Sequence, residues 1–96
     1  MMPATIPATK PIVFCEHALD AMIDRGATCE EVEQAIRRGE QIPAKKGRIA
    51  VRKNFLHQRL WKGRYYENKQ VMPIVAEEPD RLVVGTVYTF FFGGEG

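Results

Sequence analysis

The pattern of apolar and polar positions changes its period near residue 40, which divides the chain into a helical part and a strand-rich part. Before that point, the short apolar run 11–15 is bounded by prolines upstream and a charged residue downstream, which favours a strand. Apolar residues then recur at three- and four-residue spacing from residue 16 to Gly26, and glycine commonly closes a helix. Thr28 and Glu31 have the spacing of a capping box, so we expect a second helix from Thr28 to Gly39.

Each predicted helix carries an apolar stripe that should face a core. Residues three and four positions apart lie on the same side of a helix. The stripe of the first helix is Ala18, Leu19, Met22 and Ile23, and that of the second is Cys29, Val32, Ala35 and Ile36. On this interpretation Cys29 is a core residue.

From residue 48 onwards apolar residues alternate with polar ones, which is the period of a strand exposed on one side. In the first such run, 48–55, Lys53 falls on the apolar side and indicates a strand end, a bulge or a functional position. Further strands are expected over 60–67, 70–77 and 82–92, and Gly63 is interpreted as a hairpin glycine. Pro73 lacks an amide hydrogen, which predicts that 70–77 is an edge strand or holds a bulge. The run 82–92 is apolar on both faces, so we expect it to be the central strand.

This order of elements predicts an α+β fold. It consists of a short strand, two helices, and then a three- or four-stranded antiparallel curved sheet with the helices against one face. The 96 residues fit one small domain, which forms either a monomer or a homodimer. We place a flexible N-terminal arm at 1–10, the α+β domain at 11–92 and a C-terminal tail at 93–96.

Composition narrows the class of protein. Two cysteines are too few for a disulfide framework and are typical of a reduced cytosolic protein. No stretch resembles an export signal or a membrane span, so we expect a cytoplasmic protein without membrane contact. Cys15, His17, Cys29 and His57 lack the spacing of a metal site, and no phosphate-binding glycine loop occurs. We therefore expect neither a metal nor another cofactor.

The net charge of +2 is distributed unevenly along the chain. Residues 1–40 carry −3, residues 41–70 carry +8, and residues 71–96 carry −3. Aromatic residues and His57 are interleaved with the cations of the middle segment, which is the composition of a surface that meets phosphates and bases. A solvated charged face on a hairpin gives the same pattern.

Acid–base chemistry on a phosphodiester, without a metal, is the reaction that these residue types favour. It needs a base for the ribose 2′-hydroxyl, an acid for the leaving oxygen, and cations beside the developing negative charge. Histidine, tyrosine, lysine and arginine together supply all three roles.

Two stretches resemble the domain-of-unknown-function family numbered 4258. The first is an apolar strand that leads into a helix with a His-Ala start and an Arg-Gly end, here Phe14, His17, Ala18, Met22, Arg25, Gly26, Thr28, Glu31 and Val32. The second is a closing strand that contains Thr86, Val87 and Tyr88 after an acidic turn. The run 61–66, with 69–71, is similar to a subgroup of small bacterial proteins.

The resemblance implies a fold similar to the RelE/ParE toxin group, whose wider class includes small metal-free ribonucleases. The family motif supports His17, Arg25 and Tyr88 as candidate catalytic residues. The local charge pattern adds candidate RNA- or phosphate-binding residues: Arg48, Arg52, Lys53, Arg59, Arg64, Tyr66 and Lys69. Structural alternatives remain open, because a histidine at a helix start can cap or pack, and arginine or tyrosine can cover a core.

We therefore expect a small toxin-like protein that binds RNA or ribosome-bound mRNA, with an antitoxin as its protein partner. The pattern leaves open whether it is also a metal-independent endoribonuclease. The alternative is a non-catalytic binding or regulatory module whose basic sheet contacts an acidic protein.

Overall fold

The computed structural model describes residues 10–94 of the chain, so most of the predicted arm and the last two residues of the predicted tail lie outside the described part. Lys10, the last residue of that arm, is anchored: its Nζ lies 2.9 Å from a Glu77 carboxylate oxygen and donates to the Glu78 carbonyl at 2.7 Å. The elements, in chain order, are β1 (Ile12–Phe14), α1 (Glu16–Arg25), α2 (Cys29–Arg38), β2 (Glu40–Pro43), a 3-10 turn (Lys45–Gly47), β3 (Ile49–Trp61), β4 (Arg64–Glu77) and β5 (Leu82–Phe92).

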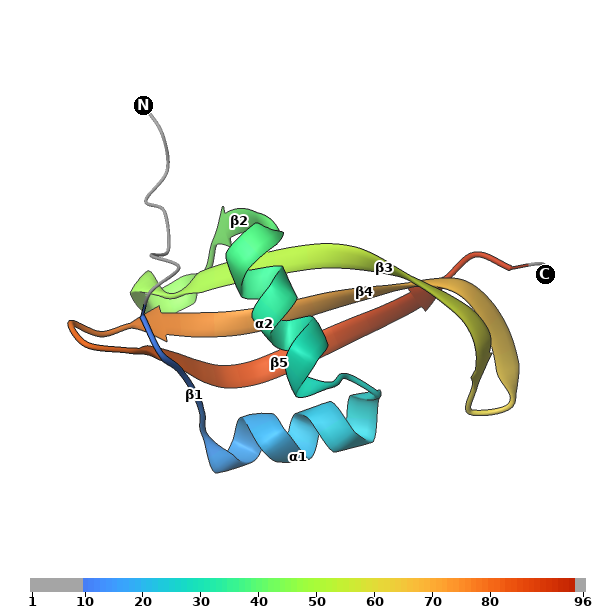
Figure 1. Ribbon diagram of the computed structural model, residues 1–96, viewed down its shortest axis with the longest axis horizontal. Coiled ribbons are helices and arrows are strands. Elements are labelled where there is room, and N and C mark those ends of the chain that lie inside the picture. The colour runs from blue at the N-terminus through green and yellow to red at the C-terminus, as the bar shows by residue number, and fades with distance from the viewer. Residues whose placement is uncertain (1–9, 95–96) are drawn as a thin grey trace.

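The strands form one curved, open, mixed sheet in the order β1-β5-β4-β3-β2 (Figure 1). β1 runs parallel to the first residues of β5, whereas the other neighbouring strands are antiparallel. The α+β class is confirmed, and four antiparallel strands, β2 to β5, follow the helices, but the sheet as a whole is mixed and has five strands because β1 joins it in parallel. The parallel pair arises because a long crossover, which includes both helices, separates β1 from β5. β2 has four residues, too few to show an alternation in the sequence.

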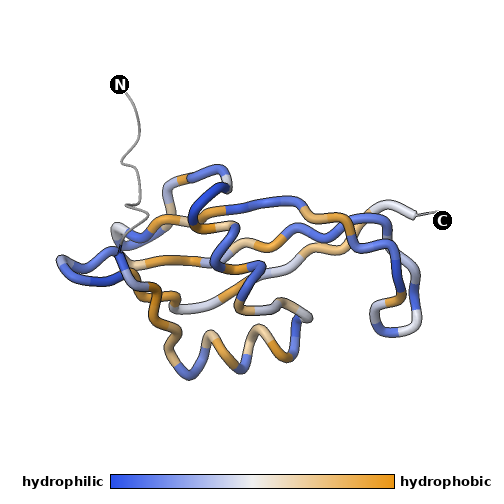
Figure 2. Tube along the Cα trace, viewed as in Figure 1, coloured by the Kyte–Doolittle hydropathy of each residue, from blue (hydrophilic) through white to orange (hydrophobic). Residues whose placement is uncertain are grey.

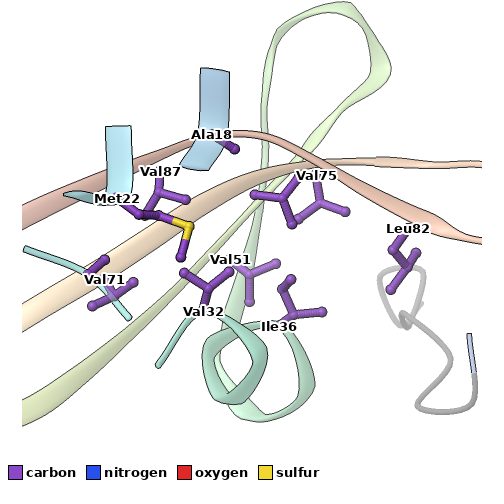
Figure 3. Packing of buried hydrophobic residues seen from close by; sticks show 11 residues of the cluster. Ala18, Met22, Val32, Ile36, Val51, Val71, Val75, Leu82 and Val87 are labelled. Atoms are coloured by element: carbon purple, nitrogen blue, oxygen red, sulfur yellow. The ribbon is translucent and has the colours of Figure 1, made fainter. Parts of the chain in front are cut away.

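Both helices lie on the same face of the sheet, with α1 along β5 and α2 across β3 and β4 (Figure 1). The core between these layers consists of small and branched side chains, which Figure 3 shows at close range. They are Ala18, Met22, Ala27, Val32, Ile36, Val51, Val71, Val75, Leu82, Val84 and Val87. Figure 2 shows the hydrophilic residues that lie on α2 and in the turn before β5.

The helix ends lie where the sequence predicts them, but the predicted apolar stripes are only partly buried. Gly26 adopts φ +76° and closes α1, and the Thr28–Glu31 capping box opens α2, as predicted. Leu19 and Ile23 are exposed, Ile23 by 80%, because Ala18, Ala21 and Met22 form the buried side of α1. The prediction that these two residues face the core is wrong.

Cys29 is also exposed, so its assignment to the core is wrong. Because Thr28 is the N-cap, Cys29 is the first residue of α2. The three other residues of its predicted stripe, Val32, Ala35 and Ile36, are buried.

β3 and β4 form a hairpin that is longer than the sequence indicates. The run predicted as 48–55 extends to Trp61, and the runs predicted as 60–67 and 70–77 are replaced by one strand from residue 64. Lys62 and Gly63 form the turn with φ of +52° and +82°, which suits a two-residue hairpin loop and confirms the hairpin glycine. A register shift between Leu56 and Arg59 interrupts the alternation of apolar and polar positions along β3. The sequence pattern therefore predicts separate strands where the structure has one long hairpin.

Pro73 lies on β4, the middle strand of the sheet, so the edge-strand alternative is wrong. A bulge on this strand is wrong as well: the β4–β5 register shifts between Ile74 and Val75, but the additional residue, Gly85, lies on β5. The prediction that 82–92 is the central strand is also wrong, since β5 lies between β4 and the short β1.

The sheet has one covered and one uncovered face. Side chains alternate along each strand, so Val51, Val71 and Val87 point toward the helices and their neighbours point away. We call the side opposite the helices the open face. Its side chains include Ile42, Arg52, Asn54, Leu56, Gln70, Met72, Ile74, Thr86, Tyr88, Phe90 and Phe92.

Candidate nucleic-acid interface

A shallow hollow of about 330 Å³ brings together two of the predicted site residues. His17 and Arg48 line it, together with Ile74, Gly85 and Thr86. Histidine and arginine thus reach the same part of the open face from elements that are far apart in the chain. The hollow is a place where an imidazole and a guanidinium can meet one small anionic group.

The position of His17 is set by the connection from β1 into α1. The Cys15 amide donates to the Val84 carbonyl at 3.1 Å, and the Cys15 thiol donates to the Gly85 carbonyl at 3.2 Å. Gly85 is the additional residue of β5 at the register shift. His17, the second residue of α1, is exposed beside this irregular segment of β5.

Arg48 stands immediately before β3, where it ends the 3-10 turn Lys45–Gly47. Its amide donates to the Lys45 carbonyl at 3.2 Å, which fixes the backbone while the side chain stays exposed. Arg48 also lines a second hollow of about 270 Å³ beside β2, with Gln41, Ile42 and Pro43 among its walls. A phosphate near Arg48 can therefore be approached from either hollow.

Arg25 and Tyr88 form a pair at the outer edge of β5. Arg25 Nη1 donates to the Val87 carbonyl at 2.9 Å, and its Cζ lies 5.0 Å from the centre of the Tyr88 ring. The Thr89 hydroxyl donates to the Arg25 carbonyl at 2.7 Å, which ties the end of α1 to β5. Arg25 thus packs against β5 and stays partly exposed beside the open face.

The three predicted catalytic residues do not converge on one point. His17 and Arg25 lie at opposite ends of α1, about 12 Å apart along its axis. Tyr88 lies two residues beyond Thr86 on the same face of β5, about 7 Å along the strand. The arrangement is a row along β5 that begins at His17 and ends at Arg25.

The predicted cations of the middle segment do not form one patch. Arg48 lies at one end of β3 and Arg59 near the other, about 36 Å apart along the strand. Arg59 and Arg64 belong to the tip of the hairpin, where Lys62 Nζ lies 5.3 Å from the centre of the Trp61 ring. The charge of +8 is therefore spread along an elongated sheet, with cations at both ends and between them.

Arg52 and Lys53 each have a partner between those ends. Arg52 Nε donates to Glu40 at 2.8 Å, and both side chains remain partly exposed. Lys53 lies on the helix-facing side of β3 with its Nζ 4.8 Å from the centre of the Phe55 ring. A strand end at Lys53 is wrong because β3 continues to Trp61, and a bulge there is wrong because the register shift occurs farther along, after Leu56.

Lys69 lies inside the fold, with 3% of its side chain exposed. Its Nζ donates at 2.8 Å both to Glu31 Oε1 and to the Gly26 carbonyl. These contacts join β4 to the loop between the helices and to the start of α2. The ammonium group therefore serves the packing, and we leave Lys69 out of the interface proposed below.

An aromatic cluster on the helix-facing side contains Tyr66 and a histidine that the sequence analysis did not place in a site. Phe91 stacks on Trp61 at 5.0 Å between ring centres, and His57 and Tyr66 contact the same ring at 5.1 and 5.5 Å. His57 is 7% exposed, and neither ring nitrogen has a hydrogen-bond partner among the described residues.

Burial is the main cause that lowers the pKa of His57 below 6.5, and the positive charges of Arg59 and Lys69 lower it further. The Leu60 backbone and Glu31 raise this pKa more weakly. His57 is thus a neutral packing residue at neutral pH. The alternation of Phe55 with His57 is the sequence signal that could have placed it on the covered face.

Residues 10–94 contain neither a metal-binding cluster of side chains nor a membrane-spanning helix. Within that part of the chain, no group of three or more histidine, cysteine, aspartate or glutamate side chains is arranged to hold a metal ion. None of the described helices has the length and apolar character needed to cross a membrane.

The family comparison covers most of the domain. A family model described as "Domain of unknown function (DUF4258)" matches residues 14–89. No curated protein and no solved structure matches the chain. The matched segment runs from the end of β1 to the middle of β5 and includes both helices and the long hairpin. The chain belongs to the DUF4258 family.

Proposed function

We propose that this protein binds RNA on the open face of its sheet and cleaves it, without a metal, at the hollow between His17 and Arg48. The observation that carries the proposal is the meeting of these two side chains beside Thr86. An imidazole can take up and return a proton near neutral pH, and a guanidinium holds phosphate through parallel hydrogen bonds. The two groups that phosphodiester cleavage needs first are thus available in one place.

The proposed reaction is an internal transfer. His17 removes the proton from the ribose 2′-hydroxyl, and the 2′-oxygen attacks the adjacent phosphorus. Arg48 stabilises the added negative charge on the phosphate oxygens. The bond from phosphorus to the 5′-oxygen then breaks, and that oxygen takes a proton from water. The products are a 2′,3′-cyclic phosphate and a free 5′-hydroxyl.

We further propose that the protein acts as a toxin of the RelE/ParE type on mRNA and is held inactive by an antitoxin. The α+β architecture with two helices on one face of a curved sheet is compatible with this assignment. A protein partner that covers the open face would block the hollow and the row along β5 together. This mode of inhibition needs no change in the fold.

The experiment compares two arginine variants for binding and cutting of a labelled mRNA fragment. Arg48→Ala should weaken binding and slow cleavage, whereas Arg38→Ala should change neither, because Arg38 is exposed on α2, on the other side of the sheet. His17→Ala should abolish cleavage and leave binding within a few-fold of the wild type. Cleavage by His17→Ala at the wild-type rate, or equal losses in both arginine variants, would overturn the proposed site.

A second candidate function is a non-catalytic module that binds an acidic protein. The outer edge of β5 favours this candidate. β1 pairs with residues 82–84 of that edge, and α1 contacts it at Val87 and Thr89. These contacts leave the edge of residues 90–92 for a partner. A partner strand could pair there. Binding of an acidic protein with no RNA binding or cleavage in any buffer would favour this candidate.

A further inference from the structure

The run Phe90-Phe91-Phe92 is divided between the two faces of the sheet. Phe91 points toward the helices and contacts Trp61, Tyr66 and His57. Phe90 and Phe92 point the other way with 49% and 41% of their surface exposed, next to Tyr88 at 41%. Among the described residues, no ring or cation contact involves Phe90 or Phe92. Three aromatic rings thus form a row on the open face: Arg25 contacts the ring of Tyr88, whereas Phe90 and Phe92 have no such contact among the described residues.

The spacing of this row suits separated bases. Alternate residues of a strand lie about 7 Å apart, roughly twice the 3.4 Å between neighbouring bases of a duplex strand. Bases that stack on successive rings must therefore be unstacked from each other. An extended single strand allows this separation, whereas a duplex holds its bases together.

The neighbours of the row on β4 are suited to the edges of bases. Met72, Gln70 and Asn68 lie opposite Tyr88, Phe90 and Phe92, respectively. Gln70 Nε2 donates to Asn54 Oδ1 at 3.0 Å across the next strand pair, which leaves further donor and acceptor positions on both amides. A base on Phe90 can therefore meet an amide at its edge.

The charges beside the row are suited to an anionic chain. Arg25 contacts the Tyr88 ring, and the row leads back through Thr86 to the hollow that His17 and Arg48 line. Glu40, which shares the open face on β2, is bound to Arg52 and is thereby neutralised. A phosphate backbone that follows β5 would meet these cations at the Tyr88 end of the row.

We propose that the open face binds single-stranded RNA in an extended form, with successive bases on Tyr88, Phe90 and Phe92 and the backbone directed to the His17–Arg48 hollow. This inference rests on the proposed function and specifies its substrate class. It assigns a role to Phe90 and Phe92 that the charge pattern does not indicate. It also excludes duplex RNA as the preferred substrate.

The test measures binding of a short oligouridylate, and of an RNA duplex of the same length, to wild-type protein and to Phe90→Ala and Phe92→Ala. Base stacking on an aromatic ring corresponds to about a 5- to 150-fold loss of affinity when the ring is removed. We expect such a loss in each variant and weaker binding of the duplex. Ile23→Ala, which removes an exposed apolar side chain from α1, is the matched control and should bind as the wild type does. Trp61 fluorescence verifies that each variant is folded.

The failures of the two proposals are distinguishable. If the wild type binds oligouridylate and duplex equally and the phenylalanine variants bind like the wild type, the stacking row is wrong while RNA binding stands. If the wild type binds no RNA, both proposals fail. If the substitutions change only the sedimentation of the protein, the row covers a second copy of the chain, and the single-strand proposal is overturned.

Discussion

Replacing Lys69 with methionine removes a positive charge from the interior but keeps a side chain of similar length. The Lys69 ammonium group is shared by Glu31 Oε1 and the Gly26 carbonyl, each at 2.8 Å. The same Glu31 oxygen accepts from the Thr28 amide in the capping box at 3.1 Å. Lys69→Met therefore removes one donor from the Glu31 carboxylate and one from the Gly26 carbonyl, at the junction of both helices with the sheet.

The expected loss of stability follows from the burial of the two partners. Removing one member of a buried ion pair costs about 3–5 kcal/mol. Glu31 keeps 19% of its side chain exposed and retains the Thr28 amide, so water can replace part of what Lys69 supplies. We therefore expect the free energy of unfolding to fall by about 3 kcal/mol, out of roughly 5–14 kcal/mol for a chain of this length. The melting temperature should fall by about 12–24 °C.

Urea unfolding followed by Trp61 fluorescence is the assay, because Trp61 is the single tryptophan and stacks on Phe91. Glu31→Gln and the double variant complete a thermodynamic cycle, in which the coupling energy between the two residues should be about 1–3 kcal/mol. RNA affinity of the folded Lys69→Met protein should equal that of the wild type. Stability within about 0.5 kcal/mol of the wild type, together with lost RNA binding, would refute the interior role of Lys69.

Two further predictions concern the packing around Trp61. A Cβ at Gly26 would lie 2.8 Å from two atoms of the Trp61 ring, so Gly26→Ala should destabilise the protein by about 2–3 kcal/mol and change the Trp61 emission. The control is Gly63→Ala, because Gly63 has a similar positive φ but open space around it; this variant should lose about 1 kcal/mol and keep its emission. Equal losses of stability in the two variants would contradict the Trp61 contact. His57 has a lowered pKa, so the unfolded chain binds more protons than the folded protein below pH 6.5, and stability should fall as the pH decreases from 7 to 5. His57→Phe should keep the contact with Phe91 and reduce this fall, as measured by urea unfolding at each pH, whereas an unchanged pH dependence would contradict the assignment.

Local signals predicted the helices well. The capping box at Thr28 and the αL glycine at position 26 depend on a few neighbouring residues, and both are present in the structure. The buried side of α1 was harder to predict, because apolar residues lie on two adjacent sides of the helix. The side that faces the sheet carries Ala18 and Ala21, whereas Leu19 and Ile23 lie on the exposed side. Small residues allow the helix to approach β5 closely, while Ile23 remains outside.

The sheet was predicted less completely, because strand pairing depends on residues far apart in the chain. The parallel pairing of β1 with β5 joins segments about 70 positions apart and leaves no local pattern. The register shift after Leu56 hid the continuity of the long hairpin for a similar reason.

In the candidate site, too, single residues could be predicted from the sequence, but not which of them lie together. The sequence identified His17 and Arg48 as separate candidates, but it could not show that they line one hollow. Treating the basic segment as a single surface was misleading, since a strand carries Arg48 and Arg59 to opposite ends of the molecule. Lys69 looks like another surface cation in the sequence, yet alternation with Val71 places it on the covered face.

Amide chemical-shift mapping can show directly whether RNA binds to the open face. The uniformly ¹⁵N-labelled protein is titrated with single-stranded RNA at low salt. We expect the largest shifts at Arg48, Thr86, Tyr88 and Phe90, and no shifts on the outer side of α2. Shifts confined to α2 or to the hairpin tip, or no shift at any amide, would contradict RNA binding at the open face.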